Sequence, residues 1–393
     1  MELFIILIIT EILTQVVIRQ HFYDKSWLKY YFIVTLNAVL SIWLWVLWFE
    51  VSSYKGIFDE PHHIWVITNL AGMMAAVVFP RIVLIVFHFT GRLVRRKARG
   101  HLRILTNSGL IISSLVFLVI AYGSVRGRFN FKTEAIDINI KGLKQDLDGL
   151  KIVQISDLHL NTFYHHQDLL EKVMKRINDL NPDLLINTGD YINIGWRESV
   201  GFDTILSKTR AKYGNFAVMG NHDFGTYHPF YTETDRENNV LRMNSFIRSS
   251  GYEVLNDEFT IINIGEAKIA LIGVMTSGSF PRIVHGDLKK AATGIYGADL
   301  KILLAHDPNQ WDKDVTGKTD IAVTLSGHTH GMQVGILTKS FSWSPARYFY
   351  PRWNGLYKEK DQYLVANRGL GSLGIPFRIG MPPEITLITL HSE

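Results

Sequence analysis

The sequence predicts an α/β domain of stacked strands and helices, preceded by about four membrane-spanning helices. Three observations predict this: four long apolar stretches precede residue 124, short runs rich in Val and Ile recur after residue 150, and amphipathic helical patterns separate several of those runs. Strands that alternate with helices are typical of an α/β domain with helix-covered sheets. We expect a transmembrane region over residues 1–123, a linker and edge strand over 124–149, and a globular domain over 150–393.

The apolar stretches cover residues 3–18, 31–49, 64–89 and 104–122. Most approach or exceed the ~20 residues that a helix needs to cross a bilayer. The first stretch has no basic lead and carries Glu2 and Glu11, so we do not expect a cleaved signal peptide. Four spans is the prediction, with three as the alternative.

Basic residues near the ends of the spans indicate the orientation. The first connecting loop carries Arg19, Lys25 and Lys29, and the third, "GRLVRRKARGHLR", carries six basic residues. Because Lys and Arg are retained on the cytoplasmic side, both loops are predicted inside, which puts the globular domain on the periplasmic or extracellular side of a bacterial membrane. Arg126 and Arg128, after the fourth stretch, argue for the opposite orientation.

Pro80 and Arg81 interrupt the third stretch. A charge at mid-depth costs roughly 2.5 to 3.5 kcal/mol on insertion scales. We expect a kinked helix whose arginine reaches the interface or pairs with another span, for example through Glu11. Contact with a substrate or lipid headgroup is the alternative.

Polar residues follow five predicted strands of the globular domain at the point where each strand ends. In open α/β sheets, ligands bind beyond the carboxyl ends of the strands, so we expect these side chains to converge. Asp157 and His159 follow "KIVQIS", and Asp190 follows "DLLINT". Asn221, His222 and Asp223 follow "NFAVM". His306 follows "KILLA", and His328 and His330 follow "IAVTLS".

The residue types in this set indicate a metal site. Carboxylate, amide oxygen and imidazole together suit Mn, Fe or Zn, whereas Ca and Mg prefer oxygen alone. If the motif segments are extended, alternate residues point the same way, so that Asp157 with His159, and His328 with His330, each aim two donors at one centre. The chain has no cysteine, which excludes thiolate ligands and disulfides. His165, His166, His228 and His285 are interpreted as surface or rim residues.

At these residues the sequence resembles the calcineurin-like metallophosphoesterases. The motifs "SDLHL", "TGDY", "GNHD", "AHDP" and "GHTHG" stand in the family's order, and the resemblance covers residues from about 150 to the C-terminus. The tail "ANRGLGSLGIPFRIGMPPEITLITL" looks like the bacterial branch of membrane-associated or exported enzymes that includes some UDP-2,3-diacylglucosamine pyrophosphatases. The resemblance implies a four-layer α-β-β-α sandwich, two divalent ions, with Mn favoured over Fe or Zn, and hydrolysis of phosphoester or pyrophosphate bonds.

The resemblance also implies a role for each motif residue. Asp157, His159 and His330 are similar to the ligands of one ion, Asp190 to the bridging carboxylate, and Asn221, His306 and His328 to the ligands of the second ion. His222 resembles the catalytic histidine that is not a ligand, and Asp223 its orienting partner. One departure is Met332, where this branch usually has glycine, and we expect it to narrow the pocket or to contact an acyl chain.

The substrate is predicted less directly. The aromatic and arginine-rich residues 340–357 fit either a segment at the lipid headgroups or an ordinary packed loop. Arg368 fits either a substrate phosphate or a carboxylate partner.

Membrane lipids and a lipid-linked phosphate or pyrophosphate are the expected partners, and nucleic acid is not expected because the chain shows no other basic aromatic platform. A non-catalytic metal-binding partner of a membrane complex and a phosphodiesterase on soluble nucleotides remain alternatives; nothing in the sequence sets the oligomeric state.

Overall fold

The computed structural model describes residues 1–393 apart from residues 1, 24–25, 55–57, 95–100, 277–285 and 339. The chain divides into two compact units. The helical unit comprises Met1–Gly56, Val66–Arg126 and Gly374–Phe377, and the globular unit comprises Ile57–Trp65, Gly127–Leu373 and Arg378–Glu393. Residues 57–65, which connect two of the long helices and begin the second of them, therefore belong to the globular unit.

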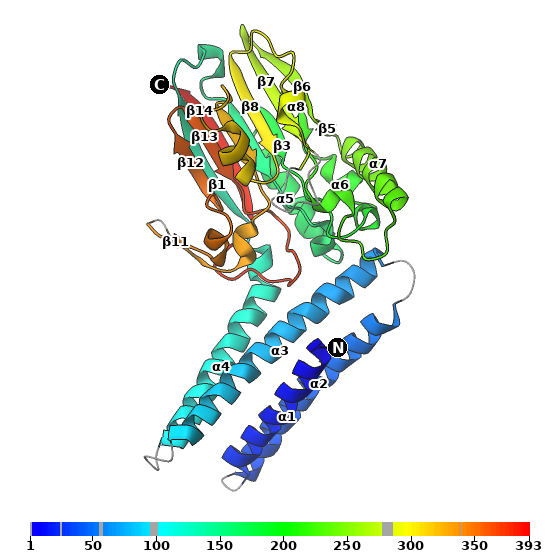
Figure 1. The fold of residues 1–393 in the computed structure, drawn as a ribbon, viewed down its shortest axis with the longest axis vertical. Helices are drawn as coiled ribbons and strands as arrows, with labels where there is room; N and C mark the ends of the chain where they lie inside the picture. The colour runs from blue at the N-terminus through cyan, green and yellow to red at the C-terminus, as the bar shows by residue number, and fades with distance from the viewer. Residues whose placement is uncertain (1, 24–25, 55–57, 95–100, 277–285, 339) are drawn as a thin grey trace. The chain divides into compact units, whose positions relative to one another are not determined.

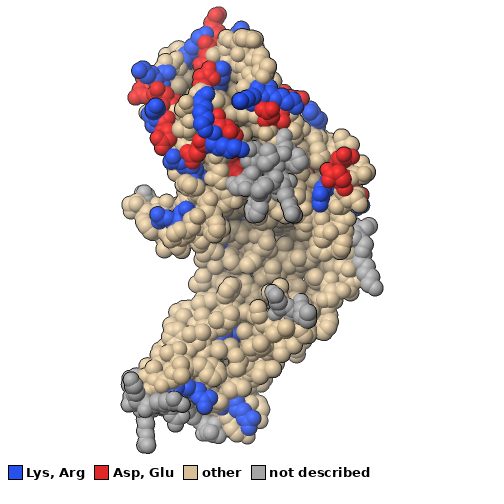
Figure 2. All heavy atoms as spheres, viewed as in Figure 1, with Lys and Arg blue, Asp and Glu red and all other residues tan. Residues whose placement is uncertain are grey.

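Over the described residues, four helices in the N-terminal part of the chain are long and apolar enough to cross a membrane, in agreement with the four predicted stretches (Figure 1). Side chains on their outer surfaces are largely apolar and exposed, and the view in Figure 2 shows few charged groups along their length. Such surfaces suit a lipid environment rather than water. The helices are α1 (Glu2–Phe22), α2 (Trp27–Ser53), α3 (Pro61–Val94) and α4 (His101–Val125).

Arg81 is paired inside the helical unit, but not through Glu11. Its guanidinium donates to Asn37 Oδ1 at 3.0 and 3.2 Å and to Ser41 Oγ, both on α2, whereas Glu11 accepts a hydrogen bond from Trp45. The helical register decides this, because Asn37 and Ser41 lie one turn apart on one face of α2. The expectation of a partner on another span is confirmed, and the choice of Glu11 was wrong.

Two six-stranded sheets form the centre of the globular unit. The first has the order β1-β14-β2-β3-β4-β5 and the second β12-β13-β9-β8-β7-β6. The first sheet comprises β1 (Lys132–Ile140), β14 (Glu384–Ser392), β2 (Lys151–Ile155), β3 (Leu184–Asn187), β4 (Asn215–Ala217) and β5 (Glu253–Val254). The second comprises β12 (Gly355–Glu359), β13 (Gln362–Ala366), β9 (Val323–Ser326), β8 (Leu300–Ala305), β7 (Ala267–Val274) and β6 (Glu258–Ile264).

Three apolar cores hold these sheets in four layers, as the predicted fold class requires. One core lies between the sheets, with Ile152 and Ile186 of the first among Leu304 and Leu325 of the second. Another packs the first sheet against α5 (Gln167–Asp179), α6 (Asp203–Leu206) and α7 (Glu233–Ser249). The third packs the second sheet against α8 (Leu288–Ala291) and the turn Trp311–Val315. The α-β-β-α sandwich is confirmed.

The five apolar runs quoted above form β2, β3, β4, β8 and β9, whereas β6 and β12 are among the strands that were not predicted. The first, "EFTIINI", contains polar residues that hide its alternation. The second begins in residues 340–357, which were interpreted either as a segment at the lipid headgroups or as a packed loop. The same stretch also contains β11 (Ser342–Trp343), which pairs with β10 (Ile336–Leu337). The edge position of β12 explains its polar sequence, since only one of its sides is paired within the sheet.

Candidate metal centre

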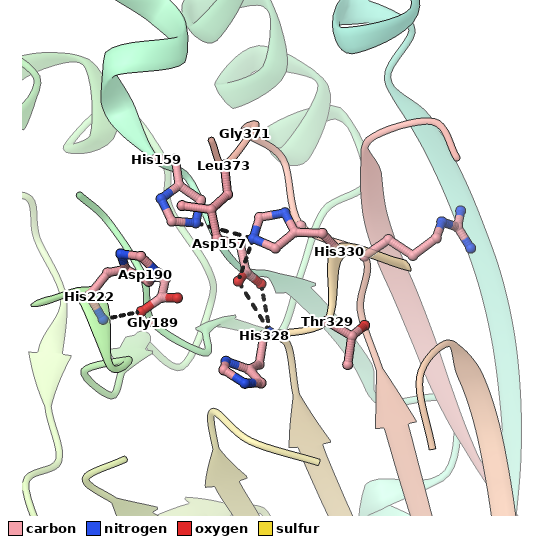
Figure 3. Close-up of polar contacts among 12 residues, drawn as sticks. Asp157, His159, Gly189, Asp190, His222, His328, Thr329, His330, Gly371 and Leu373 are labelled. Atoms are coloured by element: carbon pink, nitrogen blue, oxygen red, sulfur yellow. Dashed lines mark hydrogen bonds and ion pairs between the residues drawn. The ribbon is translucent and has the colours of Figure 1, made fainter. Parts of the chain in front are cut away.

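Five turns at the carboxyl ends of strands carry the predicted site residues, and Figure 3 shows Asp157, His159, Asp190, His222, His328 and His330 among them. β2, β3 and β4 are parallel neighbours in the first sheet, and β8 and β9 are parallel neighbours in the second. Because parallel strands end at one edge of a sheet, the segments that follow them meet. The turns supply Asp157 and His159 after β2, Asp190 after β3, Asn221 and His222 after β4, His306 after β8, and His328 and His330 after β9.

Six of these side chains form two groups with the donors of a metal site. Within each group the ligand atoms all lie within 4.8 Å of one another. The first group is Asp157, His159 and His330, and the second is Asp190, His306 and His328. His328 and His330, one residue apart, therefore face different groups.

Short contacts hold each group together. In the first, His330 Nε2 lies 3.2 Å from Asp157 Oδ1 and 3.1 Å from His159 Nε2. In the second, His306 Nε2 lies 3.0 Å from Asp190 Oδ2 and 3.3 Å from His328 Nδ1.

The backbone is left-handed at donor residues in the turns after β2, β3 and β9, so these segments are not the extended ones considered in the sequence analysis. The φ angles are +49° at Asp157, +39° at His159, +58° at Asp190, +73° at His328 and +51° at His330. Non-glycine residues in this region cost of order 1–3 kcal/mol each and persist where the surroundings enforce them. The strain is concentrated at the residues that carry the donors, and it turns each side chain toward the centre.

Two motif glycines allow the backbone to approach the carboxylates closely. A Cβ atom on Gly220 would lie 2.1 Å from Asp190 Oδ1, and one on Gly327 would lie 2.4 Å from Asp157 Oδ2. Neither position has room for a side chain, because buried carboxylates occupy the space.

Hydrogen bonds decide which atoms of the second group face the centre. His306 Nδ1 donates to the Thr188 carbonyl at 2.7 Å, which leaves Nε2 as the atom available to a metal ion. His328 Nε2 lies 3.0 Å from Tyr350 Oη, which leaves Nδ1. Asn221 Nδ2 donates to Tyr227 Oη at 3.0 Å, and Asn221 Oδ1 is buried without a hydrogen-bond partner among the described residues. A buried amide oxygen left in this way fits an ion, which would satisfy it.

The electrostatics also fit divalent cations. Burial opposes ionisation of Asp190, but His306 and His222 keep the pKa of this carboxyl well below its usual range, so it is a carboxylate. Burial lowers the pKa of His159 and His328, which keeps their imidazoles neutral. Burial also opposes protonation of His306, but the negative Asp190 raises the His306 pKa to about 10. His306 is therefore protonated beside Asp190, and a metal ion bound to His306 Nε2 would have to displace that proton.

His222 lies beside the two groups and is oriented by a backbone carbonyl, not by Asp223. Its Nδ1 donates to the Asn193 carbonyl at 2.6 Å, and its ring stacks on Tyr227 at a centroid distance of 4.2 Å. Asp223 instead accepts backbone N–H groups of Asp190, Tyr191 and Gly220 at 2.8–2.9 Å. The expected Asp223–His222 pairing was wrong, because the turn after β3 has buried amides that need an acceptor.

The structure also places the other residues that the sequence singled out. Arg368 is buried and pairs with Glu384 at 3.1 Å and Glu134 at 3.0 Å, so the carboxylate alternative holds over the substrate phosphate. Met332 follows the ligand turn with 39% of its surface exposed. His228, expected at the surface, is buried against Tyr231 at a ring distance of 3.6 Å. His165 is exposed and His166 half-buried, and His285 lies outside the described residues.

Sequence reasoning missed Arg378, which braces the first group. Its guanidinium is fully buried, donates to the carbonyls of Gly371 at 2.6 Å and Arg368 at 2.9 Å, and lies 3.2 Å from His330 Nδ1. Burial lowers the pKa of Arg378 to about 9. The quoted tail contains this arginine, but only the fold shows that it reaches the histidine.

Comparison with known proteins agrees with this geometry. Residues 150–332 match the family described as "Calcineurin-like phosphoesterase". These residues form a calcineurin-like metallophosphoesterase domain. The matched domain confirms the resemblance, and the domain and its relatives support a phosphoester hydrolase.

Three relatives show how far the similarity extends. "Uncharacterized metallophosphoesterase YkuE" of Bacillus subtilis is 28% identical over 69% of this chain and 90% of its own length. "UDP-2,3-diacylglucosamine pyrophosphatase LpxG" of Chlamydia muridarum is 29% identical over 62% of this chain and 84% of its own.

The third relative, "Transmembrane protein with metallophosphoesterase domain" of Danio rerio, is 27% identical over 86% of this chain and 77% of its own length. That coverage is larger than residues 127–393 can supply, so it extends into the long helices. With its four apolar helices, the chain is a membrane protein.

Proposed function

We propose that this metallophosphoesterase is a dinuclear, metal-dependent hydrolase of phosphoester or pyrophosphate bonds that acts on a lipid-linked or membrane-adjacent substrate. The observation that carries the proposal is the pair of three-residue donor groups, built from turns of two different sheets. Bound divalent ions would supply a hydroxide nucleophile at neutral pH and neutralise charge on the phosphoryl oxygens.

The residues of each group have distinct roles in this proposal. Asp157, His159 and His330 would hold one ion; Asn221, His306 and His328 would hold the other; and Asp190 would bridge them. Manganese fits this mixed oxygen and nitrogen set, as do iron and zinc. With Nδ1 committed to the Asn193 carbonyl, His222 has Nε2 available to exchange a proton with the leaving oxygen.

An amphipathic surface close to the site supports a lipid-linked substrate. Phe341, Tyr348 and Phe349 are each more than half exposed, while Trp353 and Ala346 of the same stretch are buried and anchor it. Tyr350, next in sequence to two of the exposed aromatics, contacts His328. Exposed aromatics beside a hydrolytic centre suit a substrate with an apolar tail. The chlamydial relative, named as a UDP-2,3-diacylglucosamine pyrophosphatase, agrees with this class.

We also propose that the hydrolytic domain lies on the outer side of the membrane. The basic loops between α1 and α2 and between α3 and α4 support this orientation. The connection before α3 and the hydrolytic domain after α4 belong to one compact unit. This is consistent with both lying on the same side of the membrane. Fusions at the C-terminus test this: alkaline phosphatase should be active and green fluorescent protein dark.

Hydrolysis itself is tested with purified protein in detergent. With Mn²⁺, we expect turnover of bis-p-nitrophenyl phosphate and of at least one class among phospholipids and lipid pyrophosphates. Asp190→Asn should abolish that turnover while the circular dichroism spectrum stays unchanged, and Asp320→Asn, which alters an exposed carboxylate, should leave turnover intact. Near wild-type turnover in Asp190→Asn would contradict the proposed centre.

A further inference from the structure

Asp59, in the connection between α2 and α3, has a fully buried carboxylate. It accepts from Arg197 Nη1 at 2.8 and 3.1 Å and from Tyr231 Oη at 2.7 Å, and His228 Nε2 lies 3.6 Å away. A Cβ atom on Gly195 would lie 2.5 Å from Asp59 Oδ2, so the backbone there closes directly over the carboxylate. Burying a charge is costly unless it is paired, so these partners are what stabilises the buried Asp59 carboxylate.

Two of the residues that enclose Asp59 belong to a turn, residues 193–198, that also contacts His222. The buried Glu198 carboxylate accepts the backbone N–H groups of Asn193, Ile194 and Gly195 at 2.6–3.2 Å. These bonds fix residues 193–198 as one piece. At one end of the piece, Gly195 and Arg197 enclose Asp59, and at the other, the Asn193 carbonyl accepts the His222 Nδ1 proton.

The same connection is fastened at a second turn of the site. Asn161 Nδ2 donates to the Pro61 carbonyl at 2.8 Å, and Asn161 lies two residues after His159. Trp65 meets His165 edge to face at 4.8 Å. Residues 58–65, the connection that is described, therefore contact the segments that follow both β2 and β3.

We propose that residues 58–65 support the geometry of the hydrolytic site and that Asp59 is a positioning residue for His222. Asp59 fixes Arg197 and Gly195, the turn 193–198 carries that restraint to the Asn193 carbonyl, and the carbonyl holds the imidazole. The connection that supplies Asp59 leads directly into α3, which begins at Pro61. The proposal rests on the proposed role of His222 for its kinetic test.

The test uses the full-length protein in detergent with Mn²⁺. Asp59→Asn removes the charge and keeps the shape, and Arg197→Gln removes its partner at a position where the side chain is one-third exposed. Each variant should lower kcat for bis-p-nitrophenyl phosphate by about 10- to 100-fold, since small displacements of a catalytic group reach that size. KM and the bound metal should stay unchanged, because neither residue contacts a proposed ligand. Glu60→Gln, the exposed neighbour, is the matched control.

Combination with His222→Ala separates positioning from a general structural role. If Asp59 acts through His222, Asp59→Asn should cause no further loss in that background, whereas a structural defect would lower kcat again. Unchanged kcat in both single variants, or an equal loss in the His222→Ala background, would overturn the proposal.

A hydrogen-exchange measurement is independent of hydrolysis. Amides of residues 193–195 should exchange faster in Asp59→Asn than in Glu60→Gln, and equal protection would overturn the proposal even if the wild-type protein hydrolyses nothing. Absence of wild-type turnover would count against the proposed function alone.

Discussion

Replacement of Tyr350 by phenylalanine is expected to weaken one of the two metal sites selectively. Tyr350 Oη lies 3.0 Å from His328 Nε2, and the two rings meet at 5.3 Å and 83°. Phenylalanine keeps the ring contact and removes only the hydrogen-bond partner. Loss of such an outer partner of a ligating histidine lowers metal affinity by about 10- to 100-fold, or about 1.4–2.7 kcal/mol.

Calorimetric titration of the metal-free protein with Mn²⁺ measures this effect. We expect one of two binding events to weaken in Tyr350→Phe while the other, which involves His159 and His330, stays within about twofold, since such effects act on the ligand that they orient. Tyr348→Phe is the matched control, because Tyr348 is 72% exposed and close in sequence. Two unchanged affinities in Tyr350→Phe would refute the assignment of His328 Nδ1 as a ligand atom.

Three further predictions follow from the site and the helices. Gly220→Ala should destabilise the protein by about 1–3 kcal/mol in thermal unfolding, because its Cβ would meet the buried Asp190 carboxylate; an unchanged melting temperature would contradict the packing described. Since the His306 pKa is raised to about 10, the His306–Asp190 ion pair stabilises the metal-free fold fully below about pH 6.5, the ordinary value, and is lost as the pH rises through 10. Metal binding must displace that proton, so Mn²⁺ affinity should rise about tenfold per pH unit between pH 7 and 9, and a constant affinity would argue against it. Asn37→Leu should lower the melting temperature in detergent more than Arg81→Leu does, because it leaves the buried guanidinium without its main acceptor, and the reverse order would contradict that pairing.

The donor set of the site could be predicted from the sequence because each donor follows a buried strand. The runs before Asp157, Asp190 and His306 are strongly apolar, which makes their ends easy to locate, and parallel strands bring their ends together. Even so, the local geometry was not predicted: alternation assumes an extended chain, whereas the backbone is left-handed at Asp157, His159 and Asp190. Such conformations persist only where the surrounding structure enforces them, and a local sequence pattern does not record those surroundings.

Residues that support the donors could not be predicted in this way. Asp223 stands beside His222 in sequence, yet its carboxylate turns toward the amides after β3. Tyr350, Arg378 and Asp59 come from segments far from the motifs, and each reaches the site through a hydrogen bond or ion pair of the folded chain. Such contacts depend on where whole segments pack, so spacing along the chain carries no signal for them.

The sequence by itself determined that four apolar helices precede an α/β domain and that carboxylates, an amide and imidazoles gather at strand ends, because hydrophobic periodicity and residue chemistry are local properties. Only the tertiary structure decided the pairing of donors into two groups, the atom that each histidine presents, and the burial of Asp59 from a helix connection inside the globular unit. Those features depend on three-dimensional packing, in which a buried polar group takes the nearest available partner, whatever its distance along the chain.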